Sequence, residues 1–326
     1  MTHPKRLMLV DINILGIGSM RQWAYSDRTF AGNATGAIHG TLDKLFALTS
    51  VFGDHVPVVL WDDRCRWREQ ILPTYKRHRW ETPEQQAFLR SYLAQAQIVR
   101  QLIGELGLLQ LSCPDFEADD LAGIICRDID PDWEVVLATS DTDWYQAIRR
   151  NVTWFSPGSG KRITVDDLGD TELIKEGPFH STDHYVNAKA LAGDSSDGIP
   201  GVAGVGLKTA AKIIREHGSV EELWAQHDAG AQIKGVARQR AAGPDTREIY
   251  HRNLRLIDWR RAPPPSADYE LQSDPGDRAA YRRTCDAWGL AAHADAPESE
   301  ACLAQDTAEA GMVVERILAA ASRRRA

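Results

Sequence analysis

The first 180 residues alternate between short apolar runs and longer amphipathic stretches. The apolar runs predict buried strands at 7–10, 56–61, 108–112 and 134–139, and an edge strand at 152–155. Between them, apolar positions recur at helical spacing over 36–51, 82–106 and 116–127. Strands that alternate with helices predict an α/β fold with a central, mainly parallel sheet flanked by helices.

After about residue 180 the pattern becomes mostly helical. Helices are expected at 183–192, 208–217, 220–226 and 245–257. A proline-rich run at 261–266 predicts a linker or rigid turn. The chain from 277 onward is expected to be helical and to end in a frayed tail at 323–325. These changes divide the chain into regions 1–180, 181–260 and 261–326, and the last is a helical extension to which no role is assigned.

Acidic residues stand directly after three of the predicted strands. Asp11 follows the first strand, Asp62 the second, and Asp141 and Asp143 the strand at 134–139. In parallel sheets ligands bind outside the carboxyl ends of the strands. A single Asp there is commonly a turn or cap residue, but acids at three strand ends indicate one shared site.

Two further acidic groups extend this pattern. Glu117, Asp119 and Asp120 begin the predicted helix at 116–127, where the helix dipole alone would favour one or two acids. Asp194 and Asp197 stand three residues apart after another helix. The predicted metal ligands are therefore Asp11, Asp62, Glu117, Asp119, Asp120, Asp141, Asp143, Asp194 and Asp197.

Such a cluster requires cations, because two carboxylates about 4 Å apart repel by roughly 4 kcal/mol at an effective dielectric of 20. A ligand set made only of carboxylates favours Mg²⁺ or Mn²⁺. Two such ions can clamp a phosphodiester and activate water. The five cysteines include no C-x-x-C pair, so a zinc site or a disulfide framework is not expected.

Two segments favour nucleic acid as the substrate. Gly204, Gly206, Lys208 and Thr209 form a Gly-x-Gly-x-Lys turn that opens a helix and can present backbone N–H groups to a phosphate. The basic segment 64–80 interleaves cations with aromatic rings, a pattern suited to phosphates and exposed bases. Its candidate DNA-binding residues are Arg66, Arg68, Tyr75, Lys76 and Arg79. A solvated basic helix and an ordinary glycine-rich loop are the alternatives.

The charge balance does not exclude DNA. The net charge is −8, but setting aside the nine candidate ligands leaves the rest of the chain close to neutral. No apolar run is long enough to span a membrane. Because Asp11 interrupts the first apolar run, that run predicts a strand and not a signal peptide, and the cytoplasm is the expected location.

In their order along the chain, these pieces resemble the structure-specific 5′-nucleases: the bacteriophage 5′-3′ exonucleases/flap endonucleases and the 5′-nuclease domain of bacterial DNA polymerase I. The matching pieces span about residues 7–260. They are Leu9-Val10-Asp11, Leu60-Trp61-Asp62, Leu72-Pro73-Thr74-Tyr75-Lys76, Glu117-Ala118-Asp119-Asp120, Thr139-Ser140-Asp141-Thr142-Asp143, Gly193-Asp194-Ser195-Ser196-Asp197 and Gly204-Val205-Gly206-Leu207-Lys208.

The resemblance implies a PIN-like catalytic domain at 1–180, a helical arch at about 64–100 and a helix-three-turn-helix DNA-binding region at 181–260. It implies that Lys76, Arg79 and Asp141 are catalytic, that Tyr75 stacks in the arch, and that two Mg²⁺, replaceable by Mn²⁺, bind the acids. It also implies a K⁺ held by backbone carbonyls at Val202 and Val205. An arginine common in the family after the first acid is not obvious here, and no residue is assigned its role.

The implied activity is metal-dependent hydrolysis of DNA near 5′ single-strand/duplex junctions, including removal of flaps and RNA primers. The implied substrates are DNA with a 5′ flap or 5′ end and RNA–DNA primer junctions. A replicative DNA polymerase is the implied partner, the protein is expected to be a monomer, and the expected location is the cytoplasm of a bacterium or of a phage-infected host.

Two other functions fit part of the pattern. A non-catalytic, junction-binding replication protein would use the glycine-rich turn but not nine clustered carboxylates. A ribonuclease with a similar α/β core would use fewer acids and would not need the basic segment. Junction binding without turnover would favour the first, and a preference for single-stranded RNA the second.

Overall fold

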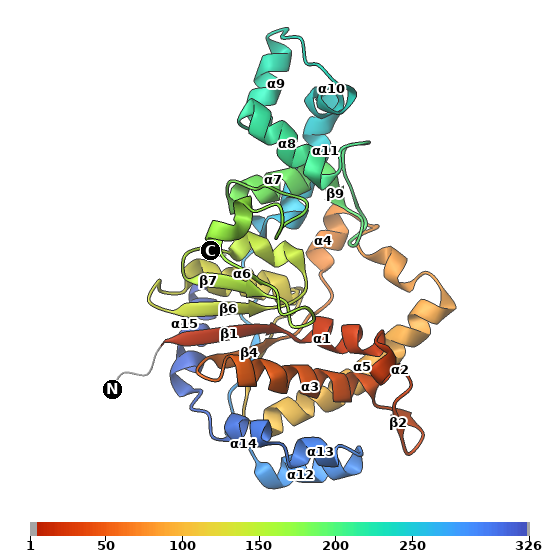
Figure 1. The fold of residues 1–326 in the computed structure, drawn as a ribbon, viewed down its shortest axis with the longest axis vertical. Helices are drawn as coiled ribbons and strands as arrows, with labels where there is room; N and C mark the ends of the chain where they lie inside the picture. The colour runs from red at the N-terminus through yellow and green to blue at the C-terminus, as the bar shows by residue number, and fades with distance from the viewer. Residues whose placement is uncertain (1–4, 325–326) are drawn as a thin grey trace.

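The computed structural model describes residues 5–324, so Arg325 of the predicted tail lies outside the described residues. A seven-stranded sheet forms the centre of the molecule, in the order β11-β5-β4-β1-β6-β7-β8 (Figure 1). The five parallel strands are β1 (Arg6–Asp11), β4 (Val56–Leu60), β5 (Leu109–Ser112), β6 (Glu134–Ala138) and β7 (Val152–Phe155). The prediction of an α/β fold with a mainly parallel sheet is confirmed.

The strands are apolar on both sides because helices cover both faces of the sheet. In β1, Leu7 and Leu9 face one core, and Met8 and Val10 face the other. The first core contains α6 (Ala118–Asp128) and α15 (Ala308–Arg323). The second contains α1 (Ile12–Met20), α3 (Gly36–Val51), α5 (Pro83–Glu105), α12 (Arg278–Ala287), α13 (Ala291–Ala294) and α14 (Pro297–Leu303). Between α1 and α3 lie α2 (Trp23–Ser26) and the hairpin of β2 (Thr29–Phe30) and β3 (Asn33–Ala34).

The segment predicted as an arch leaves the body of the molecule on the right-hand side of Figure 1. It runs through α4 (Arg66–Ile71) and the short helix η1 (Arg77–Trp80) into α5. α5 starts with a capping box in which Thr82 and Gln85 satisfy each other's backbone N–H groups, with Pro83 in the first turn. This cap fixes where the segment turns back toward the sheet.

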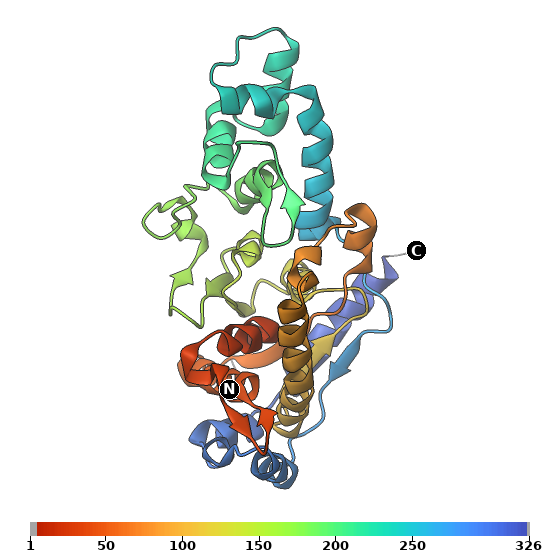
Figure 2. The same ribbon diagram turned by 90° about the vertical axis from the view of Figure 1, so that its right-hand side faces the viewer.

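Five helices form the upper part of the molecule in Figures 1 and 2. They are α7 (Thr182–Ala192), α8 (Leu207–His217), α9 (Val220–Asp228), α10 (Val236–Ala242) and α11 (Pro244–Ile257). α7 packs against both α8 and α11. The turn between α7 and α8 contains a small hairpin of β9 (Gly193–Asp194) and β10 (Ile199–Pro200).

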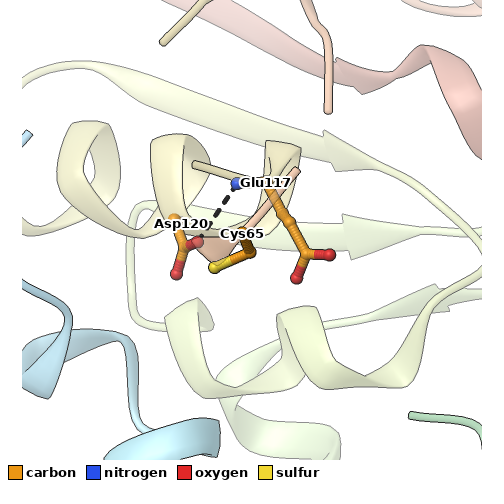
Figure 3. A group of neighbouring side chains, drawn as sticks. All are labelled: Cys65, Glu117 and Asp120. Atoms are coloured by element: carbon orange, nitrogen blue, oxygen red, sulfur yellow. Dashed lines mark hydrogen bonds between the residues drawn. The ribbon is translucent and has the colours of Figure 1, made fainter. Parts of the chain in front are cut away.

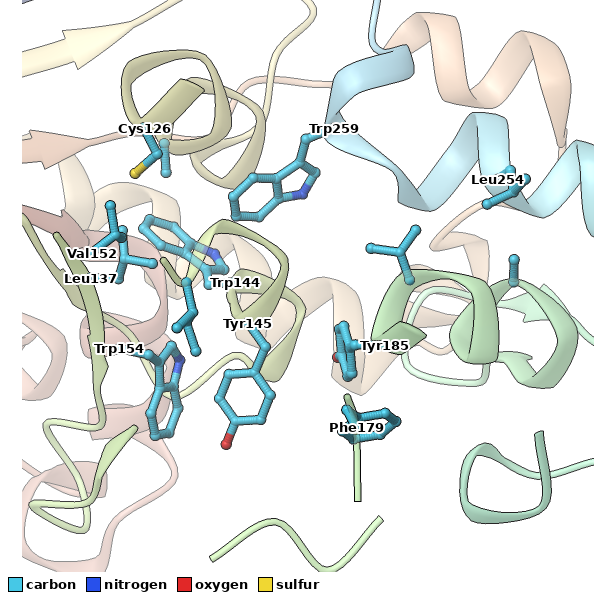
Figure 4. Packing of buried hydrophobic residues seen from close by; sticks show 14 of the residues in the cluster. Cys126, Leu137, Trp144, Tyr145, Val152, Trp154, Phe179, Tyr185, Leu254 and Trp259 are labelled. Atoms are coloured by element: carbon cyan, nitrogen blue, oxygen red, sulfur yellow. The ribbon is translucent and has the colours of Figure 1, made fainter. Parts of the chain in front are cut away.

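An apolar cluster joins this helical region to the sheet (Figure 4). Tyr145, on the short helix η2 (Thr142–Ala147), packs edge-on against Trp154 of β7, with ring centroids 4.9 Å apart. Tyr145 also contacts Tyr185 of α7, whose ring centroid is 5.1 Å from that of Phe179. The cluster holds the two regions together beside the acids of η2.

Two predictions about the sheet are wrong. The strand at 152–155 is not at the edge, because β8 (Arg162–Ile163) pairs with β7. The C-terminal extension is not purely helical, because β11 (Glu270–Gln272) pairs antiparallel with β5 and forms the opposite edge. α15 then buries Val314, Ile317 and Leu318 in the core shared with α6. Among residues 5–324, no helix has the length and apolarity needed to cross a membrane.

Candidate active site

The acids predicted at strand ends lie at the carboxyl edge of the parallel sheet. Asp11 is 7% exposed; its carboxylate accepts from Ile14 N–H at 3.1 Å and from the Thr139 hydroxyl at 3.0 Å. Asp62 accepts from Ala118 N–H at 2.7 Å, which ties the end of β4 to the start of α6. Burial, followed by the charge of Asp62, raises the pKa of Asp11 to about 7. Asp11 is therefore a buried carboxyl group that lies near a second acid.

Three acids from two elements meet beside this edge. Asp143, Asp194 and Asp197 each offer a carboxylate oxygen, and these oxygens all lie within 4.8 Å of one another. Asp143 is on η2, whereas Asp194 and Asp197 belong to the turn after α7. The turn is held by Asp194, which accepts from both the backbone N–H and the hydroxyl of Ser196. Residues about fifty positions apart thus form one candidate cation site.

Lys189 is a member of the site that the sequence reasoning missed. Its ammonium group contacts Asp143 and lies 2.6 Å from Asp194 Oδ2, and its side chain is 9% exposed. Burial raises the pKa of Asp194, but the charge of Lys189 and the hydrogen bonds from Lys189 and Ser196 together outweigh it and lower the pKa to about 2. The only sequence signal was a lone cation in the last turn of the helix before Asp194.

A second group joins Glu117 and Asp120 with the thiol of Cys65 (Figure 3). Glu117 is the N-cap of α6, and its backbone N–H donates to Asp120 at 3.2 Å. Arg68 contacts both carboxylates: Nη1 lies 3.0 Å from Glu117, and Nη1 and Nη2 each lie 2.7 Å from an oxygen of Asp120. Asp120 thus gives both oxygens to Arg68. Asp119 is farther away, 3.9 Å from Arg68 Nη2.

The acids are also contacted by Tyr75 and Lys76, just before η1, and by Arg79 within it. The Tyr75 hydroxyl donates to Glu117 at 2.6 Å and to Asp197 at 3.1 Å. Lys76 Nζ lies 2.6 Å from Glu117 and 3.7 Å from Asp197, and Arg79 Nη2 lies 2.7 Å from Asp197. Burial raises the pKa of Glu117, but Lys76 and Arg68 outweigh it and lower the pKa to about 2.

Two candidate DNA-binding residues face inward instead. Arg68 is 2% exposed and Tyr75 is 6% exposed, so neither side chain lies on a surface that DNA can contact in this structure. The basic and aromatic composition suggested a surface, but it does not reveal that α4 contacts α11 and that its Arg68 side chain reaches the acids at the start of α6. Arg66, in contrast, is exposed and forms only a peripheral ion pair with Asp115 at 3.2 Å.

The glycine-rich turn forms an exposed tip above two buried valines. Val202 and Val205 are 6% and 2% exposed, and Val205 N–H donates to the Val202 carbonyl at 3.0 Å. Gly204 has φ +76°, a conformation that favours glycine. Gly206 is the N-cap of α8 and supplies no side-chain acceptor to its first turn. Lys208, in that turn, is exposed, while Thr209 is half-buried.

Comparisons with known proteins identify the family of this chain. Residues 6–176 match the family model of the 5′-3′ exonuclease N-terminal resolvase-like domain, and residues 180–257 match that of the 5′-3′ exonuclease C-terminal SAM fold. The chain is 30% identical over 275 residues to a 5′-3′ exonuclease of Streptomyces coelicolor, covering 79% of this chain and 88% of that protein. The chain therefore belongs to the 5′-3′ exonuclease family.

Longer relatives and solved structures are also similar. DNA polymerase I of Thermus filiformis is 30% identical over 290 residues, which cover 89% of this chain and 32% of that protein. The chain thus spans about a third of the length of this relative. A bacteriophage T5 flap endonuclease crystallised with DNA and metal ions shares the fold, with 22% identity, a TM-score of 0.63 and coverage of 97% and 99% of the two chains.

Proposed function

We propose that this enzyme hydrolyses DNA near 5′ single-strand/duplex junctions with the help of two divalent metal ions. The observation that carries the proposal is the convergence of carboxylates from β1, β4, η2, α6 and the turn after α7, in a chain that also has an exposed glycine-rich tip. Clustered carboxylates can bind the metal ions that cleave a phosphodiester, and the glycine-rich tip can bind the backbone of a duplex. Together they favour an enzyme that cuts at a set distance from a junction.

The described acids fit divalent ions. They supply only oxygen ligands, as Mg²⁺ and Mn²⁺ prefer. One ion would be held by Asp143, Asp194 and Asp197, whose carboxylate oxygens lie within 4.8 Å of one another. A second would be held by Asp11, Asp62, Glu117, Asp119 and Asp141; Asp62 and Asp141 lie close enough to Asp11 for their charges to raise its pKa. Burial, followed by the charges of Asp62 and Asp141, raises the pKa of Asp11, and a bound cation would offset these effects. When bound, two ions supply an activated water and stabilise the leaving oxygen.

The chain's own residues would orient the substrate around this site. Arg79 is 41% exposed on its side chain and Lys76 is 18% exposed, so both cations border the acids from the solvent side. A cation at this position stabilises negative charge that develops on the phosphate. The hydroxyl of Thr139 and the N–H of Ile14 hold the Asp11 carboxylate in place.

Further parts of the proposal come from the family resemblance. They are a K⁺ at the carbonyls of Val202 and Val205, RNA–DNA primer junctions as substrates, a replicative DNA polymerase as partner, a monomeric state and a cytoplasmic location. A T5 relative crystallised with DNA and metal ions supports the use of a flap-like DNA substrate and divalent ions.

Cleavage of a 5′-flap duplex tests the proposal. In Mg²⁺ or Mn²⁺ the protein is expected to release the flap, and EDTA is expected to stop the reaction. Asp141→Ala, which removes a carboxylate at the end of β6, is expected to lower the rate by about 100-fold or more, since even residues that only orient ligands contribute about 10- to 100-fold. Flap binding without turnover in either metal would support a non-catalytic junction-binding protein instead.

The salt dependence of DNA binding tests whether the exposed glycine-rich tip contacts phosphates. If Lys208 contacts a phosphate, Lys208→Ala is expected to lower the slope of log Kd against log salt by about 1. Lys212→Ala is the matched control, because Lys212 lies one turn further along α8 and is 59% exposed, but it faces Glu216. Fluorescence anisotropy with a flap duplex in Ca²⁺ measures both slopes. Equal slopes in wild type and Lys208→Ala would contradict the assignment.

A further inference from the structure

The last turn of α11 lies against the acidic site, and Arg68 joins the two. The carbonyls at the end of a helix have no partner within it. Arg68 Nε donates to one of these, Leu256 O, at 2.9 Å. The same guanidinium holds Glu117 and Asp120 at the start of α6. One buried side chain therefore fixes the end of α11 relative to two of the predicted metal ligands.

A second tie holds the same helix end on its other side. The Gln146 amide donates to Ile257 O at 3.1 Å and to the backbone carbonyl of Asp143 at 3.0 Å. Its oxygen accepts from Trp259 N–H at 3.0 Å. The end of α11 is thus fixed to η2 as well as to α6.

α11 in turn carries the turn that leads to the glycine-rich tip. Asn253 is fully buried, and its amide donates to Ala190 O at 2.9 Å and to Pro200 O at 3.1 Å. Arg252 donates to the same Pro200 carbonyl at 2.8 Å. A small apolar cluster completes the joint; it contains Cys65, Leu72, Tyr75, Ile199, Leu256 and Ile257.

We propose that Arg68 is a positioning residue that fixes the distance from the duplex-binding tip to the carboxylates and so decides which phosphodiester is cut. The inference rests on the proposed function. Arg68 is 2% exposed, so it acts without touching DNA. Its planar guanidinium presents donors in several fixed directions, which the single ammonium of a lysine cannot reproduce.

Mapping of the cut at single-nucleotide resolution tests the proposal, with Arg68→Lys, a labelled 5′ flap and Mg²⁺. The wild type is expected to give one dominant product. Because a displacement of about 1 Å at a reacting centre can cost on the order of 100-fold in rate, Arg68→Lys is expected to lower the ratio of main-site to neighbouring-site cleavage by about 10-fold. Duplex affinity is expected to stay within about twofold, since no phosphate contact is lost.

The controls separate positioning from a general loss of structure. Arg282→Lys changes an exposed ion pair with Asp295 in the C-terminal extension and is expected to keep the wild-type ratio. If Arg68→Lys keeps the wild-type ratio of main-site to neighbouring-site cleavage, the proposal is overturned. This includes the case in which cleavage falls equally at every site. If Arg68→Lys does not fold, Gln146→Met removes the second tie and keeps Arg68; an unchanged ratio there would also overturn it. Absence of cleavage by the wild type would instead refute the proposed function.

Discussion

Asp11→Asn is expected to stabilise the metal-free protein at pH 8 and to abolish most of its nuclease activity. The pKa of Asp11 in the folded protein is about 7, above its ordinary value of 3.8. The folded state therefore holds a proton that the unfolded chain releases, and the free energy of unfolding falls as the pH rises from about 4 to 7. Three pKa units correspond to about 4 kcal/mol, which sets the upper limit of the gain from the neutral side chain.

Urea denaturation in EDTA at pH 5 and pH 8 measures how much the free energy of unfolding of Asp11→Asn exceeds that of the wild type. This difference is expected to be larger at pH 8. The Asn amide can replace both contacts of Asp11, because its oxygen can accept from Ile14 and its NH₂ group can donate to the Thr139 hydroxyl. Flap cleavage is expected to fall by about 100-fold or more. Asp132→Asn, at an exposed turn, is the control for charge removal. A variant no more stable than wild type at pH 8, or one fully active, would contradict the assignment of Asp11.

Arg68→Ala is expected to lower the free energy of unfolding by about 3–5 kcal/mol, because it leaves the buried Asp120 carboxylate without a cationic partner and removes one of the two cations that contact Glu117. The side chain of Asp120 is fully buried and that of Glu117 is 9% exposed, so water cannot replace the guanidinium. The end of α11 would also lose the donor to Leu256 O. Equilibrium urea unfolding measures the change.

Arg64→Ala is the matched comparison for this loss. Arg64 also pairs with an acid, Glu69, at 2.8 Å, but its side chain is 70% exposed. Exposed pairs contribute about 0–1 kcal/mol, so this variant is expected to unfold close to the wild type. Similar decreases in the free energy of unfolding of Arg68→Ala and Arg64→Ala would show that burial of the ion pair does not determine the loss of stability.

Much of the fold was predictable because the central strands are uninterrupted apolar runs. β1, β4 and β6 have one or no exposed residue among their five or six, and the pattern identified all three. β8 and β11 were missed because they contain two and three residues, and neither shows a strand pattern of its own. Their pairing depends on the strands beside them, which sequence periodicity does not report.

The acids that follow strand ends, Asp11, Asp62, Asp141 and Asp143, could be located because the apolar runs fix the positions of those ends. The positions of the cationic side chains were harder to predict, because composition gives the charge of a residue but not the direction in which its side chain points. Arg68 has the sequence context of a surface residue, yet its side chain is buried between the end of α11 and the start of α6. Lys189 was missed because a lysine in a helical pattern is ordinarily exposed, and only the fold brings Asp143 beside it.

The position of β11 has a consequence for the order in which the chain folds during synthesis. The ribosome makes β5 about 160 residues before its edge partner β11, which ends at Gln272. Until then, the nascent sheet has one side of β5 unpaired, with Leu109 and Leu111 in a strand that can pair with other chains. Because translation adds about 5–20 residues per second, this edge is open for roughly 10–30 seconds, a period in which a chaperone or a neighbouring nascent chain can bind it.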